Sequence, residues 1–206
     1  MTEAAPLDAE LVAAEHGRAL VGLAWAAIDG GLAAGASRRA PKPLDLDAFP
    51  IELRAPGATF VTLEKAGGLR GCIGSLQAHR PLVDDLAQNA YAAAFRDPRF
   101  PPLEAAERPD VCLSISILSA PEVIAGVESE ADLLAALEPG VDGLILADGA
   151  RRATFLPQVW KQLPAPADFV TRLKAKAGLP ADHWGPGMKV WRYGVVKIGD
   201  ETAQGA

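Results

Sequence analysis

The sequence predicts a soluble α+β protein, and three features of its 206 residues point to this fold class. Segments with a helical period alternate irregularly with segments in which apolar and polar residues alternate. Short turn sequences join the strand-like segments in pairs, which is typical of hairpins. Hairpins mixed with helices favour a mixed or antiparallel sheet over a doubly wound parallel one. The length suits one domain, expected over residues 1–200, with residues 201–206 as a disordered tail.

The first helix is expected directly after a short polar N-terminal stretch. Asp8 is a suitable cap, and apolar residues follow at a helical period up to about Asp29. The pair Gly30-Gly31 is expected to end this helix. Residues 31–56 are rich in Ala, Gly and Pro, so they predict a long connection along the surface.

A hairpin and a second helix are expected next. Residues 60–65 and 69–76 form its two strands, joined by a glycine-rich turn. Pro81 suits the first turn of a helix. That helix must end before Pro98, because a residue that precedes proline avoids the α conformation.

The clearest strand of the chain is Val111 to Ser119, in which apolar residues alternate strictly with small polar ones. The remaining elements are expected to follow it in order. They are a helix near residues 129–137, hairpin strands at 144–147 and 152–155, a short helix at 157–163, a helix at 166–178 and a closing strand at 188–198.

Composition and charge exclude several classes of function. The net charge is −6 with a pI near 5.1, so the phosphate backbone of a nucleic acid would be repelled. No basic start precedes an apolar run, and no apolar run approaches the ~18 residues of a membrane span. Two cysteines and three histidines lack metal-ligand spacing, so no metal site and no cofactor are expected. Free thiols indicate the cytoplasm.

The segment from Leu69 to Ser75 carries the most unusual local sequence, with a cysteine between two glycines. On a strand, Arg70, Cys72 and Gly74 share one face, while Leu69, Gly71 and Ile73 face the core. This pattern places a guanidinium beside a thiol, and Gly74 is expected to leave open space above the sheet.

This arrangement suits a reactive cysteine, although a purely structural reading is also open. An adjacent arginine favours the thiolate, and Arg70 is a candidate to bind a carboxylate or phosphate of a ligand. Alternatively, Cys72 is a small buried hydrophobe and Arg70 an exposed strand residue. A nucleophilic cysteine needs a base, for which His79 is a candidate; the alternative is a solvated loop histidine.

A second unusual segment runs from Asp97 to Pro102, where Asp97 and Arg99 flank Pro98. One interpretation is a rigid helix exit held by an ion pair. The other is an anion clamp beside the strand of Cys72. Cys112 is expected to be a packed structural thiol, or a redox partner of Cys72 if their strands are neighbours.

Four motifs in order resemble the AMMECR domain family, whose bacterial members are called AmmeMemoRadiSam system protein A. They are Leu69-Arg70-Gly71-Cys72-Ile73-Gly74, Asp97-Pro98-Arg99-Phe100-Pro101-Pro102, Leu156-Pro157-Gln158-Val159-Trp160 and Lys176-Ala177-Gly178-Leu179. The resemblance extends from the first helix to about Ile198. It implies two unequal subdomains around a cleft, a cytosolic setting, and a link to Memo-type and radical SAM proteins.

The family motif also marks candidate site residues, and His79 lies outside it. These residues are Arg70, Gly71, Cys72, Gly74, Asp97, Arg99 and Phe100. The resemblance supplies no reaction, so two hypotheses follow. The chain is an enzyme or accessory enzyme of a modification pathway, with Cys72 as nucleophile or acyl carrier and Arg70 and Arg99 as anion binders. Alternatively, it is a non-catalytic scaffold that holds a peptide, a metabolite or a pathway partner in the same cleft.

Overall fold

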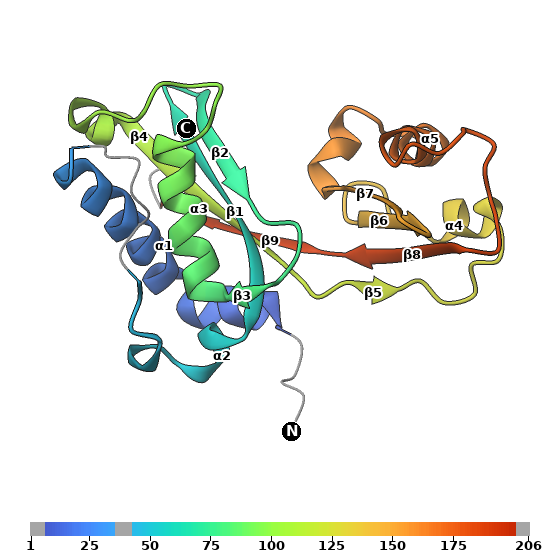
Figure 1. Ribbon diagram of the computed structural model, residues 1–206, viewed down its shortest axis with the longest axis horizontal. Coiled ribbons are helices and arrows are strands. Elements are labelled where there is room, and N and C mark those ends of the chain that lie inside the picture. The colour runs from blue at the N-terminus through green and yellow to red at the C-terminus, as the bar shows by residue number, and fades with distance from the viewer. Residues whose placement is uncertain (1–6, 36–42, 201–206) are drawn as a thin grey trace. The chain divides into compact units, whose positions relative to one another are not determined.

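The computed structural model describes residues 7–35 and 43–200, so the tail expected at 201–206 lies outside the described residues (Figure 1). The chain divides into two compact units. The first unit comprises Met1–Ser119 with Val196–Ala206, and the second comprises Ala120–Val195. Each unit contains helices, an antiparallel hairpin and a hydrophobic core of its own. The predicted α+β class is confirmed.

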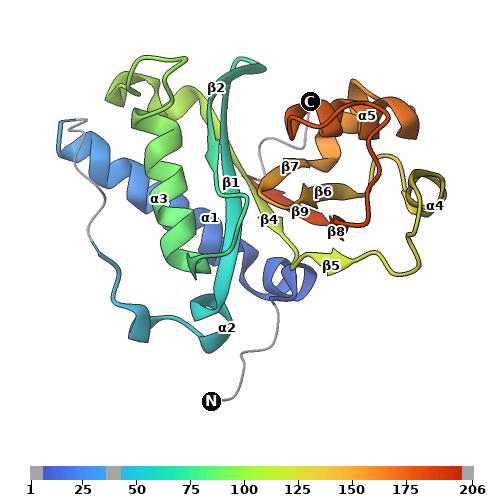
Figure 2. The same ribbon diagram turned by 45° about the vertical axis from the view of Figure 1, so that its right-hand side comes forward.

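The first unit is built on a sheet with the strand order β2-β1-β4-β9, and β3 pairs with the start of β1. The helices α1 and α3 cover one face of this sheet (Figures 1 and 2). The elements of this unit are α1 (Ala9–Ala33), η1 (Leu46–Ala48), α2 (Ile51–Arg54), β1 (Pro56–Lys65), β2 (Gly68–Gly74), β3 (Arg80–Pro81), α3 (Leu82–Phe95), η2 (Ala105–Asp110), β4 (Val111–Leu118) and β9 (Val195–Gly199).

The helix α1 begins at the predicted cap but runs further than expected. The carboxylate of Asp8 accepts hydrogen bonds from the backbone of Glu10 and Leu11. The prediction that Gly30-Gly31 ends the helix is wrong, because Gly31 packs directly on α3. A Cβ atom at Gly31 would lie 2.4 Å from the ring of Phe95, so glycine here permits a close helix contact. The chain leaves the helix only near Gly35, whose φ is +74°.

Among the described residues, α1 is also the one helix that is long and apolar enough to cross a membrane by length and composition. Its stripe of Leu20, Ala24 and Ile28 is almost fully buried in the core of the first unit. This stripe packs against the sheet and α3 and so belongs to the core of the first unit.

The predicted hairpin is confirmed as β1 and β2. Ala66 and Gly67 form its turn with φ values of +51° and +75°, as a two-residue turn between twisted strands requires. The register shifts between Leu63 and Glu64, which pair with Gly71 and Leu69, so Arg70 is the extra residue of a β-bulge. The bulge breaks the alternation, and Leu69, expected in the core, is 45% exposed.

The second unit has its own sheet with the strand order β5-β8-β6-β7. Its predicted hairpin, its capped helix and the helix that starts at Pro166 are confirmed. Trp160 of the third motif is buried and stacks on Phe169 at 3.8 Å between ring centroids. The elements are β5 (Glu122–Val123), α4 (Glu130–Ala136), β6 (Gly143–Asp148), β7 (Arg151–Phe155), η3 (Pro157–Lys161), α5 (Pro166–Lys176) and β8 (Met188–Tyr193).

The predicted closing strand at residues 188–198 is wrong as a single element. The strand is interrupted at Gly194. Before it, β8 joins the sheet of the second unit, and after it, β9 completes the sheet of the first unit. The C-terminal strand therefore returns to residues met early in the sequence, and the first unit is assembled from two distant stretches of chain.

Candidate functional site

The thiol of Cys72 lies on the face of the first sheet that α1 and α3 do not cover. On the neighbouring strands β1 and β4, the adjacent residues Val61 and Ile115 point to the other face and pack in the core with the helices. Cys72 pairs with Thr62, and Thr62 pairs with Ser114, so a thiol and two hydroxyls form a row across three strands. The hydroxyl of Thr62 donates a hydrogen bond to Sγ of Cys72 at 3.5 Å. The thiol is free and partly exposed.

The backbone of Cys72 is held on its outer side by the segment that follows α3. The carboxylate of Asp97 accepts a hydrogen bond from the Cys72 N–H at 2.8 Å, and Nη2 of Arg99 donates to the Cys72 carbonyl at 3.2 Å. Because β2 is an edge strand of its sheet, these two side chains take the place of a further strand. The Asp97–Arg99 pair thus fixes the edge of the sheet at the thiol.

The Asp97–Arg99 pair is a bidentate ion pair in which the carboxylate is buried and the guanidinium is half exposed. Asp97 accepts from Nε of Arg99 at 2.9 Å and from Nη2 at 2.7 Å, and its side chain is 2% exposed. The Arg99 hydrogen bond, together with the Cys72 N–H, holds the pKa of Asp97 far below its usual range against the effect of burial. The Arg99 side chain is 53% exposed.

The Cys72 side chain also contributes to the electrostatic environment of the Arg99 guanidinium. Its pKa is raised, first by the hydrogen bond to Asp97 and then by the charge of Asp97 and of the Cys72 thiolate. Nε and Nη2 are occupied by Asp97 and by the Cys72 carbonyl, whereas Nη1 donates to no described residue. A half-exposed guanidinium that is bonded to the backbone of Cys72 is suited to bind an anionic group.

Arg70 lies in the bulge, and its guanidinium makes its hydrogen bonds within the protein. Its guanidinium binds Glu107 at 2.9–3.1 Å and donates to the carbonyls of Pro101 and Pro102. The hydrogen bond from Arg70 lowers the pKa of Glu107 to about 2. The ring centroid of Phe100 lies 6.0 Å from Cζ of Arg70 and 5.5 Å from Cζ of Arg99. Arg70 therefore anchors the proline segment, and its donors are occupied within the protein.

The two glycines of the motif permit close packing. A Cβ atom at Gly71 would lie 2.2 Å from the carbonyl oxygen of Ala93, so glycine lets α3 approach the strand. A Cβ atom at Gly74 would lie 2.2 Å from the ring of Phe60. The expectation of open space above Gly74 is wrong, because the Phe60 ring already fills that space.

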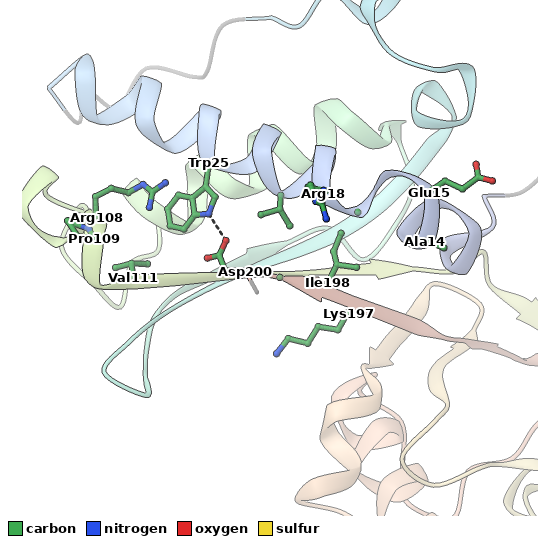
Figure 3. A pocket seen from close by; sticks show the side chains of 13 residues that line it. Ala14, Glu15, Arg18, Trp25, Arg108, Pro109, Val111, Lys197, Ile198 and Asp200 are labelled. Carbon is green, nitrogen blue, oxygen red and sulfur yellow. Dashed lines mark hydrogen bonds between the residues drawn. The ribbon is translucent and has the colours of Figure 1, made fainter. Parts of the chain in front are cut away.

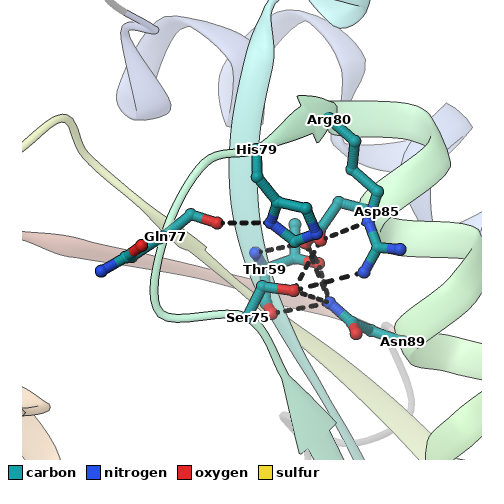
Figure 4. A network of polar contacts seen from close by, with 7 residues as sticks. All are labelled: Thr59, Ser75, Gln77, His79, Arg80, Asp85 and Asn89. Atoms are coloured by element: carbon teal, nitrogen blue, oxygen red, sulfur yellow. Dashed lines mark hydrogen bonds and ion pairs between the residues drawn. The ribbon is translucent and has the colours of Figure 1, made fainter.

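His79 lies on the exposed loop after β2, where its Nδ1 donates to the carbonyl of Gln77 at 2.9 Å (Figure 4). The nearby polar network is centred on Asp85, which is fully buried. Its carboxylate accepts from Ser75, Arg80, Thr59 and Asn89, with the shortest distance, 2.6 Å, to the Ser75 hydroxyl. This network ties the ends of β1 and β2 to α3.

Cys112 is too distant from Cys72 for a disulfide. The two residues lie on β4 and β2 with β1 between them, and they pair with Glu64 and Thr62. Two strand spacings and a two-residue offset separate their Cα atoms by about 12 Å, whereas a disulfide needs less than about 7 Å. Both thiols are free. Within residues 7–35 and 43–200, no group of His, Cys, Asp or Glu side chains is arranged to hold a metal ion.

Three residues of the site could not be predicted from the sequence. Strand alternation alone places Thr62 and Ser114 on a polar face, but only the register of β1 with both neighbours brings them into line with Cys72. Glu107 gave no local signal, because its partner Arg70 is 37 residues away in the chain. Together these observations define a small α+β protein whose edge strand presents a thiol between hydroxyls and an arginine.

Comparisons with known proteins agree with this architecture. The AMMECR1 family model matches residues 21–198, so the chain belongs to the AMMECR1 family. A protein of Methanothermobacter thermautotrophicus is 40% identical over 181 residues, which cover 87% of this chain and 91% of that protein. Protein MJ0810 of Methanocaldococcus jannaschii is 35% identical over 158 residues, covering 75% of this chain and 78% of that protein.

A solved structure is similar over almost the whole chain. The crystal structure of the uncharacterised protein PH0010 from Pyrococcus horikoshii has a TM-score of 0.71 and 33% sequence identity, and the match covers 91% of this chain and 92% of that chain. The family resemblance first indicated by the four motifs is thereby confirmed.

Proposed function

We propose that this AMMECR1-family protein is an enzyme, or an accessory enzyme, that uses Cys72 as a nucleophile or acyl carrier for an anionic substrate. The observation that carries the proposal is the hydrogen bond from Arg99 to the backbone carbonyl of Cys72, which holds a half-exposed guanidinium suited to a carboxylate or phosphate at the residue that bears the thiol. The Thr62 hydroxyl, which donates to the sulfur, would stabilise the thiolate.

The proposed chemistry needs only a thiolate and an activated acyl group. The thiolate sulfur attacks the acyl carbon, a carbon–sulfur bond forms, and the leaving group departs with the electron pair of its bond to carbon. The thiol proton is lost to water beforehand, since His79 is engaged with Gln77 and lies outside the motif. Arg99 would hold the anionic part of the substrate during the attack, and Asp97 would keep Arg99 in place.

The biological setting of this proposal comes from the family resemblance. We place the protein in a modification pathway of the cytoplasm, with Memo-type and radical SAM proteins as partners. The free thiols of Cys72 and Cys112 are compatible with a reducing compartment.

A non-catalytic scaffold is the second candidate, and one observation favours it. Most charged groups of the two motifs are occupied within the protein: Arg70 binds Glu107, and Asp97 binds Arg99 and the backbone of Cys72. A motif so fully used in building a rigid edge would also suit a surface that holds a peptide, a metabolite or a partner.

Substitution of the two thiols separates these candidates. Cys72→Ser and the matched control Cys112→Ser are introduced into a strain that lacks the native protein, and the modified product is followed by mass spectrometry. The enzyme proposal predicts loss of product in Cys72→Ser alone. Full product formation by Cys72→Ser, with partner binding retained, would contradict the enzyme proposal and favour the scaffold.

A further inference from the structure

The sheet of the second unit presents different side chains on its two faces. Leu146, Ala153 and Val190 are cross-strand partners on β6, β7 and β8, and they pack in the core with Leu133 and Phe169 of the helices. Because side chains alternate along a strand, the residues directly beside these three in the chain point to the opposite face of the sheet. We call this opposite face the outer face of the second sheet.

Two cations lie in one row of the outer face. Ala147 of β6 pairs with Arg152 of β7 on one side and with Lys189 of β8 on the other. Both charged side chains are exposed, and the small side chain of Ala147 lies between them. Two strand spacings separate the Cα atoms of Arg152 and Lys189 by about 10 Å. An anion placed above Ala147 would therefore be attracted by both cations.

The next row of the outer face is apolar and lies roughly 7 Å further along the strands. Ile145 pairs with Trp191, and Trp191 pairs with Val123 of β5. Cζ of Arg152 lies 5.3 Å from the centre of the Trp191 ring, and this contact restrains the guanidinium without using its N–H donors. Val123 is 70% exposed, so the row offers an apolar surface directly beside the two cations.

The indole N–H of Trp191 adds a third donor to this surface. The other three of the four tryptophans donate their indole N–H within the protein; Trp25, for example, donates to Asp200 at 2.9 Å (Figure 3). Across residues 7–35 and 43–200, no acceptor is paired with the indole N–H of Trp191, with Lys189 or with the N–H groups of Arg152. Three side-chain donors of the outer face are thus available to a ligand.

The carboxylates on the strands of this sheet lie on the opposite face. Asp148 pairs with Met188, which packs against the core, and its carboxylate contacts Nε2 of His183 at 2.5 Å. Glu122 pairs with Arg192, and both alternate with residues of the outer face. The two cations of the outer face therefore share it with no carboxylate of their own sheet.

From these features we infer that the outer face of the second sheet binds a small phosphate monoester that carries a planar ring, as a nucleoside monophosphate does. The phosphate lies between Lys189 and Arg152, and its charge and acceptor oxygens match two cations and the indole N–H of Trp191. The ring lies on Trp191 and Val123. The surface has room for one phosphate, and the net charge of −6 opposes a longer polyanion. The site uses residues of the second unit alone and does not depend on the chemistry of Cys72.

The test titrates the full chain, labelled with ¹⁵N, with adenosine monophosphate and follows the indole N–H resonances by NMR. We expect saturable binding that shifts the resonance assigned to Trp191, which is the one absent from Trp191→Phe. Arg152→Gln and Lys189→Gln should each weaken binding about fivefold or more. Arg151→Gln is the matched control, because Arg151 pairs with Asp148 on the opposite face, and it should weaken binding less than about twofold.

Two smaller probes separate the parts of the ligand. Adenosine lacks the phosphate and inorganic phosphate lacks the ring, so each should bind at least about fivefold more weakly than adenosine monophosphate. Cys72→Ser should bind adenosine monophosphate normally. Absence of saturable binding, equal affinity for adenosine monophosphate and either smaller probe, or equal losses in Arg151→Gln and Arg152→Gln would each overturn the inference. Tighter binding of an oligothymidylate of about twelve nucleotides would also overturn it, because the occupant would then be a nucleic-acid strand.

Discussion

Removal of the Asp97 carboxylate should destabilise the first unit by about 3 kcal/mol. In Asp97→Ala, the partly buried Cys72 N–H loses its acceptor inside the protein, and leaving such a donor unpaired costs up to about 1–3 kcal/mol. Arg99 is half exposed, so the loss of its ion pair adds at most about 1 kcal/mol. Asp97→Asn retains an acceptor oxygen of nearly the same shape, so we expect a loss of only about 1 kcal/mol.

Differential scanning calorimetry measures this series directly. A loss of ~3 kcal/mol corresponds to a fall of roughly 6–12 °C in the unfolding midpoint. Asp110→Ala is the matched control, because Asp110 is an exposed carboxylate of the same unit, and its midpoint should change by less than about 2 °C. Equal midpoints for Asp97→Ala and Asp110→Ala would refute the reasoning that Asp97 holds the edge of β2.

Two further predictions concern packing and acid stability. Gly71→Ala should unfold much of the protein at 25 °C, since its Cβ would lie 2.2 Å from a backbone oxygen. Gly22→Ala, which has open space around it on a helix, should instead stabilise the protein by about 0.5–1 kcal/mol. Thermal melts compare the two variants. The depressed pKa of Glu107 means that its stabilisation is complete above its unfolded pKa and lost as pH falls from about 4.5 to about 2. Glu107→Gln should therefore be less stable at pH 7 and lose less stability across that window, measured by urea unfolding; parallel acid profiles for the two proteins would disprove this assignment.

The local elements were accessible from sequence because their signals are local. The cap at Asp8, the hairpin turn and the Ser129–Asp132 capping box each depend on residues within a few positions of one another, and all are present. The end of α1 was not predictable because Gly31 is needed for close packing against the rings of Tyr91 and Phe95, which lie 60 or more positions away in the chain.

The site was only partly accessible for the same reason. The glycine-flanked Cys72 and the Asp97–Arg99 pair stand out in the sequence. The bulge at Arg70 does not, and it directs this side chain to Glu107. The row of Cys72 with Thr62 depends on strand register, which a single strand's pattern does not determine.

The central claim is that the Cys72 thiol is a reactive group supported by Arg99, and thiol alkylation tests it most directly. Mass spectrometry follows the labelling of Cys72 and Cys112 in the native protein by neutral iodoacetamide and by anionic iodoacetate. We predict faster labelling of Cys72 with both reagents. Arg99→Gln should slow iodoacetate at Cys72 by about two- to fivefold more than iodoacetamide, as expected for a partly exposed charge pair worth about 0.5–1 kcal/mol. Equal or negligible labelling of the two cysteines in the native protein would contradict the account.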